Sequence, residues 1–178
     1  IAVDSKNAVW FGTKTEGALM YNGISWSRFT KAEGLGDNCV NAITFGPTGI
    51  AWFGTNAGLT SFDGVNWRTY TVKDGIPGYV IPAIASESNG TIWFSTAIVE
   101  SVLKGTGVVR FNGQKWDVFT TLDGLAEDQV LSIAIDKNGV KWFGTQGNGV
   151  SSYDGTIFKT YTKENGLADN TVRGIIID

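Results

Sequence analysis

The sequence predicts an all-β fold built from four repeated, four-stranded antiparallel sheets, and three observations lead to this prediction. The tetrapeptide Trp-Phe-Gly-Thr recurs four times, with Ser in place of Gly in the third copy, beginning at Trp10, Trp52, Trp93 and Trp142. A two-residue hairpin signal, Asn-Gly or Asp-Gly, follows every copy, at Asn22, Asp63, Asn112 and Asp154. Gly is abundant, at 24 of 178 residues, and β-branched and aromatic residues crowd into short runs between polar turns.

The Trp-Phe pair predicts a strand that is covered on both faces. Adjacent side chains of a strand point to opposite faces of its sheet, and both of these side chains are large and apolar. One repeat cannot hide both faces by itself, so neighbouring repeats have to stack into one cooperative body.

The second repeat shows the expected elements most plainly. An apolar run is followed by the turn Gly46–Gly49, and Asp63-Gly64 opens a tight turn because both central residues of such a turn need positive φ. The four expected strands are Val40–Phe45, Ile50–Thr55, Gly58–Phe62 and about Asn66–Thr71. A longer polar connection beginning Gly-Leu or Gly-Ile then leads to the next repeat, which completes the pattern of a β-propeller blade.

The predicted domain is a single β-propeller segment over residues 1–178, with repeats at about 1–39, 40–79, 80–129 and 130–171. Residues 172–178 start the next blade, since Ile175–Asp178 occupies the same repeat position as Ile1–Asp4. Two segments cannot fill one slot of a closed four-bladed ring. We therefore favour part of a larger ring; the alternatives are closure with one copy displaced, or two chains completing a ring together. A stack of β-helical coils is disfavoured because its coils are shorter and parallel.

Composition excludes several classes of function. The formal charge is −3 and the basic residues are scattered, so we expect no nucleic-acid partner. No run of 18 apolar residues occurs, so we expect no membrane insertion by this segment. Histidine is absent and Cys39 is the single cysteine, which we interpret as a small buried hydrophobe; we expect no metal site, no cofactor and no internal disulfide. The start at Ile1 suggests a processed or excised segment.

The repeated residues resemble a known family. The strings Val-Trp-Phe-Gly-Thr, Tyr-Asn-Gly or Phe-Asp-Gly, and Gly-Leu-x-x-(Asn/Gln)-x-Val-x-x-Ile are similar to the two-component regulator propeller repeat, over essentially the whole chain. The resemblance implies an extracytoplasmic (periplasmic or cell-surface) sensor of a bacterial hybrid histidine kinase, in a family whose sensors often respond to oligosaccharides. The β-sandwich, membrane span and kinase of such proteins are not in this segment.

Departures between the copies point to one rim of the propeller. The third copy carries about eight extra residues within Ala97–Val109, and the connection after the second copy contains Pro77 instead of an acidic-amide pair. Binding residues prefer loops held by a rigid scaffold, so we expect ligand contacts from the connections on this rim. The candidate ligand-binding residues are Thr15, Glu16, Asp37, Asn38, Asn56, Glu100, Lys104, Asp128, Gln129, Gln146, Asn148, Asp169 and Asn170.

The acidic and amide candidates have a competing interpretation, because such side chains commonly close their own loops by hydrogen-bonding nearby backbone. The functional prediction is a non-catalytic ligand-recognition or interaction propeller with an oligosaccharide or another protein as partner. A structural scaffold is the alternative. The third candidate is a polysaccharide-active enzyme, which would use a pair of carboxylates as acid and base. It ranks last because the sequence contains no motif-like pair of acidic residues. The carboxylates considered for it are Glu16, Asp37, Asp74, Glu100, Asp123, Asp128 and Asp169.

Overall fold

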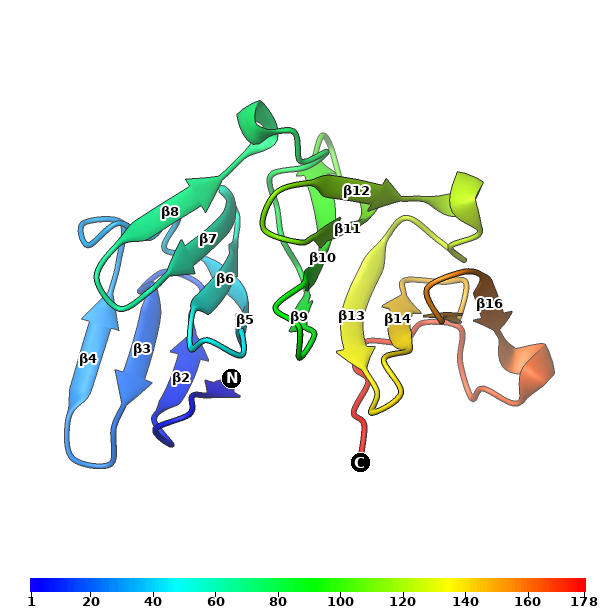
Figure 1. Cartoon of the computed structure of the whole chain (residues 1–178). Coiled ribbons are helices and arrows are strands. Elements are labelled where there is room, and N and C mark those ends of the chain that lie inside the picture. The colour runs from blue at the N-terminus through cyan, green and yellow to red at the C-terminus, as the bar shows by residue number, and fades with distance from the viewer.

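The computed structural model describes all 178 residues and consists of four antiparallel sheets of four strands each. Figure 1 shows the sheets fanned side by side, with β5, β9 and β13 toward the inside of the arc and both termini on that side. The first sheet contains β1 (Ala2–Val3), β2 (Val9–Gly12), β3 (Ala18–Tyr21) and β4 (Trp26–Phe29). The second contains β5 (Val40–Phe45), β6 (Ala51–Thr55), β7 (Gly58–Phe62) and β8 (Trp67–Tyr70).

The third sheet departs from the others in its strand lengths. It contains β9 (Ile84–Ser86), β10 (Ile92–Val99), β11 (Leu103–Phe111) and β12 (Trp116–Phe119). The fourth contains β13 (Val130–Ile135), β14 (Lys141–Thr145), β15 (Val150–Tyr153) and β16 (Phe158–Tyr161). In every sheet the strands neighbour one another in chain order, and residues 171–178 follow the fourth sheet without a strand. The propeller-blade fold is confirmed. The helical segments are 3₁₀ turns of three residues each, which are too short to span a membrane.

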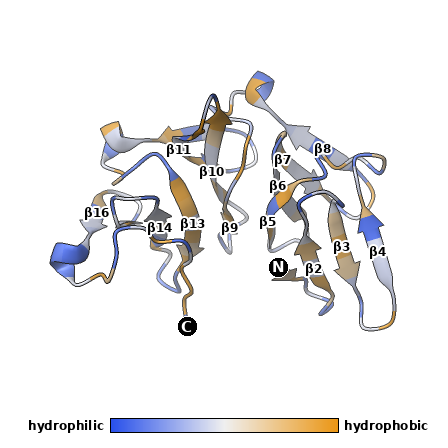
Figure 2. Cartoon of the chain, turned by 180° about the vertical axis from the view of Figure 1, so that it is seen from behind, coloured by the Kyte–Doolittle hydropathy of each residue, from blue (hydrophilic) through white to orange (hydrophobic).

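The paired aromatics lie between the sheets, as the two-faced strand predicts. In the three spaces between sheets a Trp faces the following sheet and the Phe of that sheet faces back: Trp10 lies 5.8 Å from Phe53 of the second sheet, and Trp93 lies 5.9 Å from Phe143 of the fourth. Phe53, Trp93 and Phe143 are fully buried. Three separate apolar clusters result, one in each space between neighbouring sheets. In Figure 2 the hydrophobic colour gathers on inner and middle strands such as β10 and β13, away from the last 3₁₀ turn.

The Gly and Thr of the Trp-Phe-Gly-Thr motif also have defined structural roles. A Cβ on Gly54 would lie 2.7 Å from the carbonyl oxygen of Ile81, so the first residues of the next blade approach the bare backbone there. The hydroxyl of Thr55 donates to the carbonyl oxygen of Gly58 at 2.8 Å and fixes the turn between β6 and β7. In the third blade Ser95 stands in the Gly position, and its hydroxyl accepts from Ala83 N at 3.1 Å.

The connections from each blade to the next are held by short capped turns. The 3₁₀ turns Val72–Asp74, Thr121–Asp123 and Lys163–Asn165 each begin after a Thr whose hydroxyl accepts a backbone N–H. The third residue of each turn returns the bond to the capping Thr, so both ends of the capping box are present. The apolar residues Ile76 and Leu125, just after the first two of these turns, are buried between sheets, as is Leu35 in the connection after the first blade, whereas Leu167 is half-buried.

An ion pair joins the third and fourth blades. Lys141 is only 8% exposed, and its ammonium lies 3.3 Å from Glu87 Oε1 and 5.3 Å from the ring centre of Trp93. The same carboxylate oxygen accepts the indole N–H of Trp93 at 2.6 Å. The turn residue Glu87 therefore ties its own blade to the next one.

One sequence-based expectation about side-chain burial is wrong. Cys39 is half-buried rather than buried, because it lies on the rim before β5, with its Sγ 3.6 Å from Asn41 Oδ1. Trp26 is 60% exposed, whereas its counterparts Trp67, Trp116 and Phe158 are half-buried against the apolar clusters. Its side chain is on the outer face of the first sheet, where no neighbouring sheet covers it.

Candidate ligand-binding groove

The structure brings the two kinds of variable connection together on one rim. In the first blade the N–H of Gly17, in the turn between β2 and β3, donates to the carbonyl oxygen of Asn38 at 2.9 Å. Gly107 and Asp128 make the same bond at 3.0 Å. Gly149 and Asn170 make it at 2.8 Å. In three of the four blades, therefore, the turn between the second and third strands is hydrogen-bonded to the connection that leaves the blade.

Five of the thirteen candidates hold their own loops. The side-chain oxygens of Asn38, Asp128 and Asn170 each accept from a backbone N–H seven residues earlier, at 3.0, 2.7 and 2.8 Å. Asp37 accepts from Cys39 N at 2.8 Å, and Asp169 accepts from Thr171 N at 2.7 Å. The Thr171 bond holds the pKa of Asp169 below its ordinary value. These oxygens already have protein partners.

Candidates from the turns between second and third strands have mixed surroundings. Glu16 pairs with Arg28 at 2.7 Å, and Thr15 beside it is exposed. Gln146 is exposed, and its N–H donates to the carbonyl oxygen of the half-buried Gln129 at 3.0 Å.

The fourth blade shows a contact that sequence reasoning missed. Asn148 Nδ2 donates to the carbonyl oxygen of Ala126 at 3.1 Å. Glu127 Oε2 accepts from Gly147 N at 2.7 Å and from Asn148 N at 3.2 Å. Glu127 therefore binds this turn to the preceding connection. The sequence feature that could have identified Glu127 is its position between Ala126 and Asp128 in the repeated connection.

The insertion in the third blade is an extended hairpin rather than a loop. After a register shift between Ser95 and Ala97, β10 and β11 continue to pair through Val99 and Leu103. Glu100 lies in the exposed turn of this hairpin, and Lys104 lies opposite Ile98. The strands continue because the inserted residues are largely β-branched or small, which suits a two-stranded ribbon.

Tyr79 fixes the hairpin to the rim. Its hydroxyl donates to the carbonyl oxygen of Val99 at 3.0 Å and accepts from Val99 N at 2.9 Å. Its backbone N–H also donates to Ala97 at 3.1 Å. Tyr79 stands in the repeat position that Asn38 holds in the first connection, so the departure in that connection and the insertion form one structural unit.

A groove of about 370 Å³ lies where this hairpin meets the inner strands. One wall carries amides, with Asn41 Nδ2 donating to Asn56 Oδ1 at 2.9 Å. The other walls are apolar, and no charged side chain lines the groove. Its lining residues are Asn41, Asn56, Val80, Pro82, Val99 and Leu103. Among the predicted candidates only Asn56 lines the groove. Of the other lining residues, Asn41 lies in β5, Val80 and Pro82 precede β9, and Val99 and Leu103 belong to the hairpin, so their positions depend on the fold.

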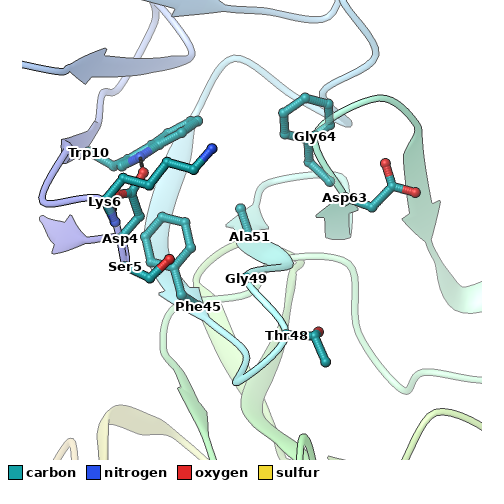
Figure 3. Close-up of a pocket in the computed structure, with 11 residues that line it drawn as sticks. Asp4, Ser5, Lys6, Trp10, Phe45, Thr48, Gly49, Ala51, Asp63 and Gly64 are labelled. Atoms are coloured by element: carbon teal, nitrogen blue, oxygen red, sulfur yellow. Dashed lines mark hydrogen bonds between the residues drawn. The ribbon is translucent and has the colours of Figure 1, made fainter.

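Two hollows on the opposite rim repeat one another. The first, about 310 Å³, lies between the tight turns of the first and second blades and includes Asp4, Lys6, Trp10 and Asp63. Figure 3 shows the Lys6 side chain extending past Trp10, whose indole N–H donates to Asp4 Oδ2 at 3.0 Å. A similar hollow of about 280 Å³ lies between the turns of the third and fourth blades. Their recurrence identifies them as consequences of blade packing.

The carboxylates considered for catalysis are mostly engaged in structure. Asp74 and Asp123 belong to capping boxes, and Glu16 is paired with Arg28. Asp37, Asp128 and Asp169 hold loop N–H groups as described above. No group of three or more His, Cys, Asp or Glu side chains is placed to hold a metal ion.

No protein-family model and no curated protein matches the chain by sequence. Solved structures match it by fold. The extracellular domain of BT3049 from B. thetaiotaomicron, assigned to a hybrid two component system, superposes with a TM-score of 0.79 at 24% identity, over 94% of this chain and 23% of that one. The corresponding domain of BT4673 from the same organism gives 0.75 at 17% identity, over 99% and 24%.

Propellers with other roles also match. PorZ, a surface component of the type-IX secretion system of Porphyromonas gingivalis, gives a TM-score of 0.71 at 19% identity, over 99% of this chain and 29% of that one. Virginiamycin B lyase from Staphylococcus aureus gives 0.70 at 16% identity, over 89% and 53%. The chain thus spans about a quarter of the two B. thetaiotaomicron domains, and the likeness establishes the propeller fold.

Proposed function

We propose that this chain is a ligand-recognition segment of a bacterial extracytoplasmic sensor propeller, of the kind that feeds two-component signalling. The likeness to the extracellular domains of BT3049 and BT4673 supports the sensor role and the extracytoplasmic location. The repeat motifs favour the same class. The engagement of the rim carboxylates in loop closure favours a non-catalytic role, although a GH74 enzyme also shares the fold.

The observation that carries the proposal is the groove beside the hairpin of β10 and β11. The four blades share one rigid scaffold, and binding residues are usually found on loops that vary over such a scaffold. The hairpin of β10 and β11 is the largest difference between the blades. The groove combines two amides with the apolar side chains of Val80, Val99 and Leu103. Amides exchange hydrogen bonds with hydroxyl groups, and apolar walls suit the C–H faces of a sugar ring, so a neutral oligosaccharide is the proposed ligand class.

The test measures calorimetric binding of a panel of neutral oligosaccharides to the wild-type chain. We expect at least one to bind and Leu103→Asp to abolish that binding, because it places a charge on the apolar wall. Asn56→Ala should weaken it by about tenfold or more, since one hydrogen-bonding wall is lost. Val102→Asp is the matched control: Val102 is in the same hairpin turn, 71% exposed and outside the groove. Equal affinity of wild type and Leu103→Asp would refute the assignment.

A protein-binding scaffold is the second candidate, favoured by the exposed apolar tip of the same hairpin. Val99, Val102 and Leu103 are 53%, 71% and 38% exposed. The fold likeness to PorZ supports this candidate. The variants above separate the two functions, because Val102→Asp should abolish docking of a protein on the tip and leave sugar binding in the groove unchanged.

A further inference from the structure

The amide wall of the groove presents a defined pattern of hydrogen-bonding groups. Each Asn side chain carries one carbonyl acceptor and an NH₂ group with two donors. Asn41 Nδ2 donates to Asn56 Oδ1 at 2.9 Å, and the only other hydrogen bond of these two side chains is a weak one from the Cys39 thiol to Asn41 Oδ1, at 3.6 Å. Both amides are exposed. The wall therefore offers the N–H donors of Asn56 and the carbonyl oxygen of Asn41 to a ligand.

The fold does not require this pair of amides. The backbone closes the loop at this point, with Asn56 N donating to the carbonyl oxygen of Cys39 at 3.3 Å, and the fourth blade has the equivalent backbone bond. Leu131 occupies the position of Asn41 in the fourth blade, because each directly follows the first residue of the inner strand. A leucine cannot form the amide bond, so the pair is an addition to the repeat rather than a part of it.

The other walls of the groove carry no hydrogen-bonding side chain. Val99 and Leu103 are direct partners across the hairpin, so their side chains lie next to each other on one face of it. Val80 and Pro82 complete the apolar lining. A hydroxyl group facing these walls would lose its hydrogen bonds to water and find no side-chain partner. The groove therefore suits a chemical group that is polar on one edge and apolar on the other.

We propose that the groove binds an N-acetylhexosamine residue of a neutral glycan through its acetamido group. This inference rests on the proposed oligosaccharide ligand and narrows its class. The acetamido carbonyl oxygen accepts from Asn56 Nδ2, and the neighbouring ring hydroxyl donates to Asn41 Oδ1. The acetyl methyl group packs against Val99 and Leu103. The volume of about 370 Å³ is at the lower end of small-molecule sites, which suits one residue of a longer sugar chain.

Sugars without an acetamido group match the groove less well. A plain hexose carries a hydroxyl in its place, which can bond to the amides but supplies no methyl group to the apolar walls. A deacetylated amino sugar brings an ammonium group, and no acidic side chain lines the groove to pair with it. Preference for the acetamido group is therefore the property that distinguishes this ligand class.

The test compares matched sugars by calorimetry on the wild-type chain. The trisaccharides are N-acetylated chitotriose, its deacetylated form, and cellotriose, which has the same rings and linkages with hydroxyls in place of the acetamido groups. Methyl glycosides of N-acetylglucosamine, N-acetylgalactosamine, glucose and galactose cover both ring configurations. We expect the N-acetylated member of at least one pair to bind about tenfold or more tightly than its hydroxyl counterpart. Saturation-transfer NMR should give its strongest signal on the acetyl methyl group.

Two variants divide the site into its polar and apolar parts. Leu103→Asn keeps the size of the side chain and makes that wall polar, so it should reduce the preference for the N-acetylated sugar by about fourfold or more. Asn41→Leu introduces the residue of the fourth blade and should weaken both sugars alike, by about tenfold. Gln114→Ala is the control, because Gln114 carries an exposed amide outside the groove. Circular dichroism of each variant checks that the fold is kept.

The outcomes separate this inference from the proposed function. A plain hexose chain that binds as tightly as its N-acetylated counterpart, and loses that binding in Leu103→Asp, would overturn the inference and leave the proposed function in place. Failure of every sugar to bind would overturn both. An uncharged N-acetylated tripeptide amide that binds as tightly as the sugars would also overturn the inference, since the groove would then recognise an amide without a sugar ring.

Discussion

Gly54 and Ile81 are in contact across the boundary between the second and third blades, backbone against backbone. A Cβ on Gly54 would lie 2.7 Å from the carbonyl oxygen of Ile81 and 2.9 Å from its Cγ2. Gly12 and Gly144 have the same relation to Val40 and Val172, at 2.7 and 2.6 Å from their carbonyl oxygens. The glycine of the repeat is thus required by the arrival of the next blade.

A larger residue in place of Gly54 should therefore push the second and third blades apart. We expect Gly54→Ala to lower the free energy of unfolding by about 1–3 kcal/mol, the usual cost of overpacking, because the atom that must move belongs to the backbone. Urea denaturation followed by tryptophan fluorescence measures it. Gly46→Ala is the control, since its nearest atoms would be 3.7 Å away. Equal losses in the two variants would contradict this account.

The buried ion pair between Glu87 and Lys141 should be more important than a surface pair. Glu87→Ala leaves the ammonium of Lys141 buried without its partner, and removing one member of a buried pair costs about 3–5 kcal/mol. Because Glu87 also accepts the indole N–H of Trp93, the loss includes that bond. The measurement is thermal and urea unfolding.

The exposed pair of Glu16 and Arg28 supplies the comparison. Both side chains are more than half exposed, and such pairs contribute about 0–1 kcal/mol. We therefore expect Glu16→Ala to change the free energy of unfolding far less than Glu87→Ala. A loss for Glu87→Ala no larger than that for Glu16→Ala would show that Lys141 finds water instead.

Repetition made the fold predictable from the sequence. Each copy of Trp-Phe-Gly-Thr fixes a two-faced strand, and each Asn-Gly or Asp-Gly pair fixes a hairpin, so a weak local signal is confirmed four times. The strand Val40–Phe45 has the expected bounds for the same reason. The Gly54–Ile81 contact was not predictable, because it depends on the distance between blades.

The groove was less predictable than the fold. Asn56 was a candidate because it lies in a rim turn, but Pro82 and Leu103 reach the groove only through the pairing of β10 with β11. The sequence shows that residues are inserted near Ala97, and it does not show that they continue the strands. Tyr79, which holds the hairpin through two bonds to Val99, was visible only as a departure from the acidic-amide pattern.

Trp52 is expected to stabilise the fold without contributing to a site. It is 8% exposed, stacks 6.0 Å from Tyr70 and lies 6.0 Å from Phe111 of the next blade. Removing a buried aromatic ring leaves a cavity, so Trp52→Ala should lower the free energy of unfolding by about 3–5 kcal/mol. Ile24→Ala, at a 92% exposed position, serves as control. A Trp52→Ala chain as stable as wild type would contradict the placement.

Carboxylates in the tight turns make the free energy of unfolding depend on pH in the acidic range. The indole N–H of Trp142 and the backbone N–H groups of Val140 and Asn138 hold the pKa of Asp136 below its ordinary 3.8. Backbone N–H bonds lower the pKa of Asp63 and of Asp154 in the hairpin turns. Because the folded pKa values are depressed, these carboxylates stabilise the fold above the unfolded pKa, and that contribution is lost as the pH falls through the folded values.

We therefore expect the free energy of unfolding to be nearly constant from neutral pH to about pH 5 and to fall below about pH 4. Asp136→Asn should flatten this acid limb relative to wild type, because the amide does not titrate; since it keeps only one acceptor oxygen, it loses either the Trp142 bond or the two backbone bonds and should also be less stable at neutral pH. Urea midpoints measured at closely spaced pH values for both proteins provide the test. Two acid limbs of identical slope would exclude Asp136 as a contributor, and a stability that rises on acidification would contradict the whole set of turn carboxylates.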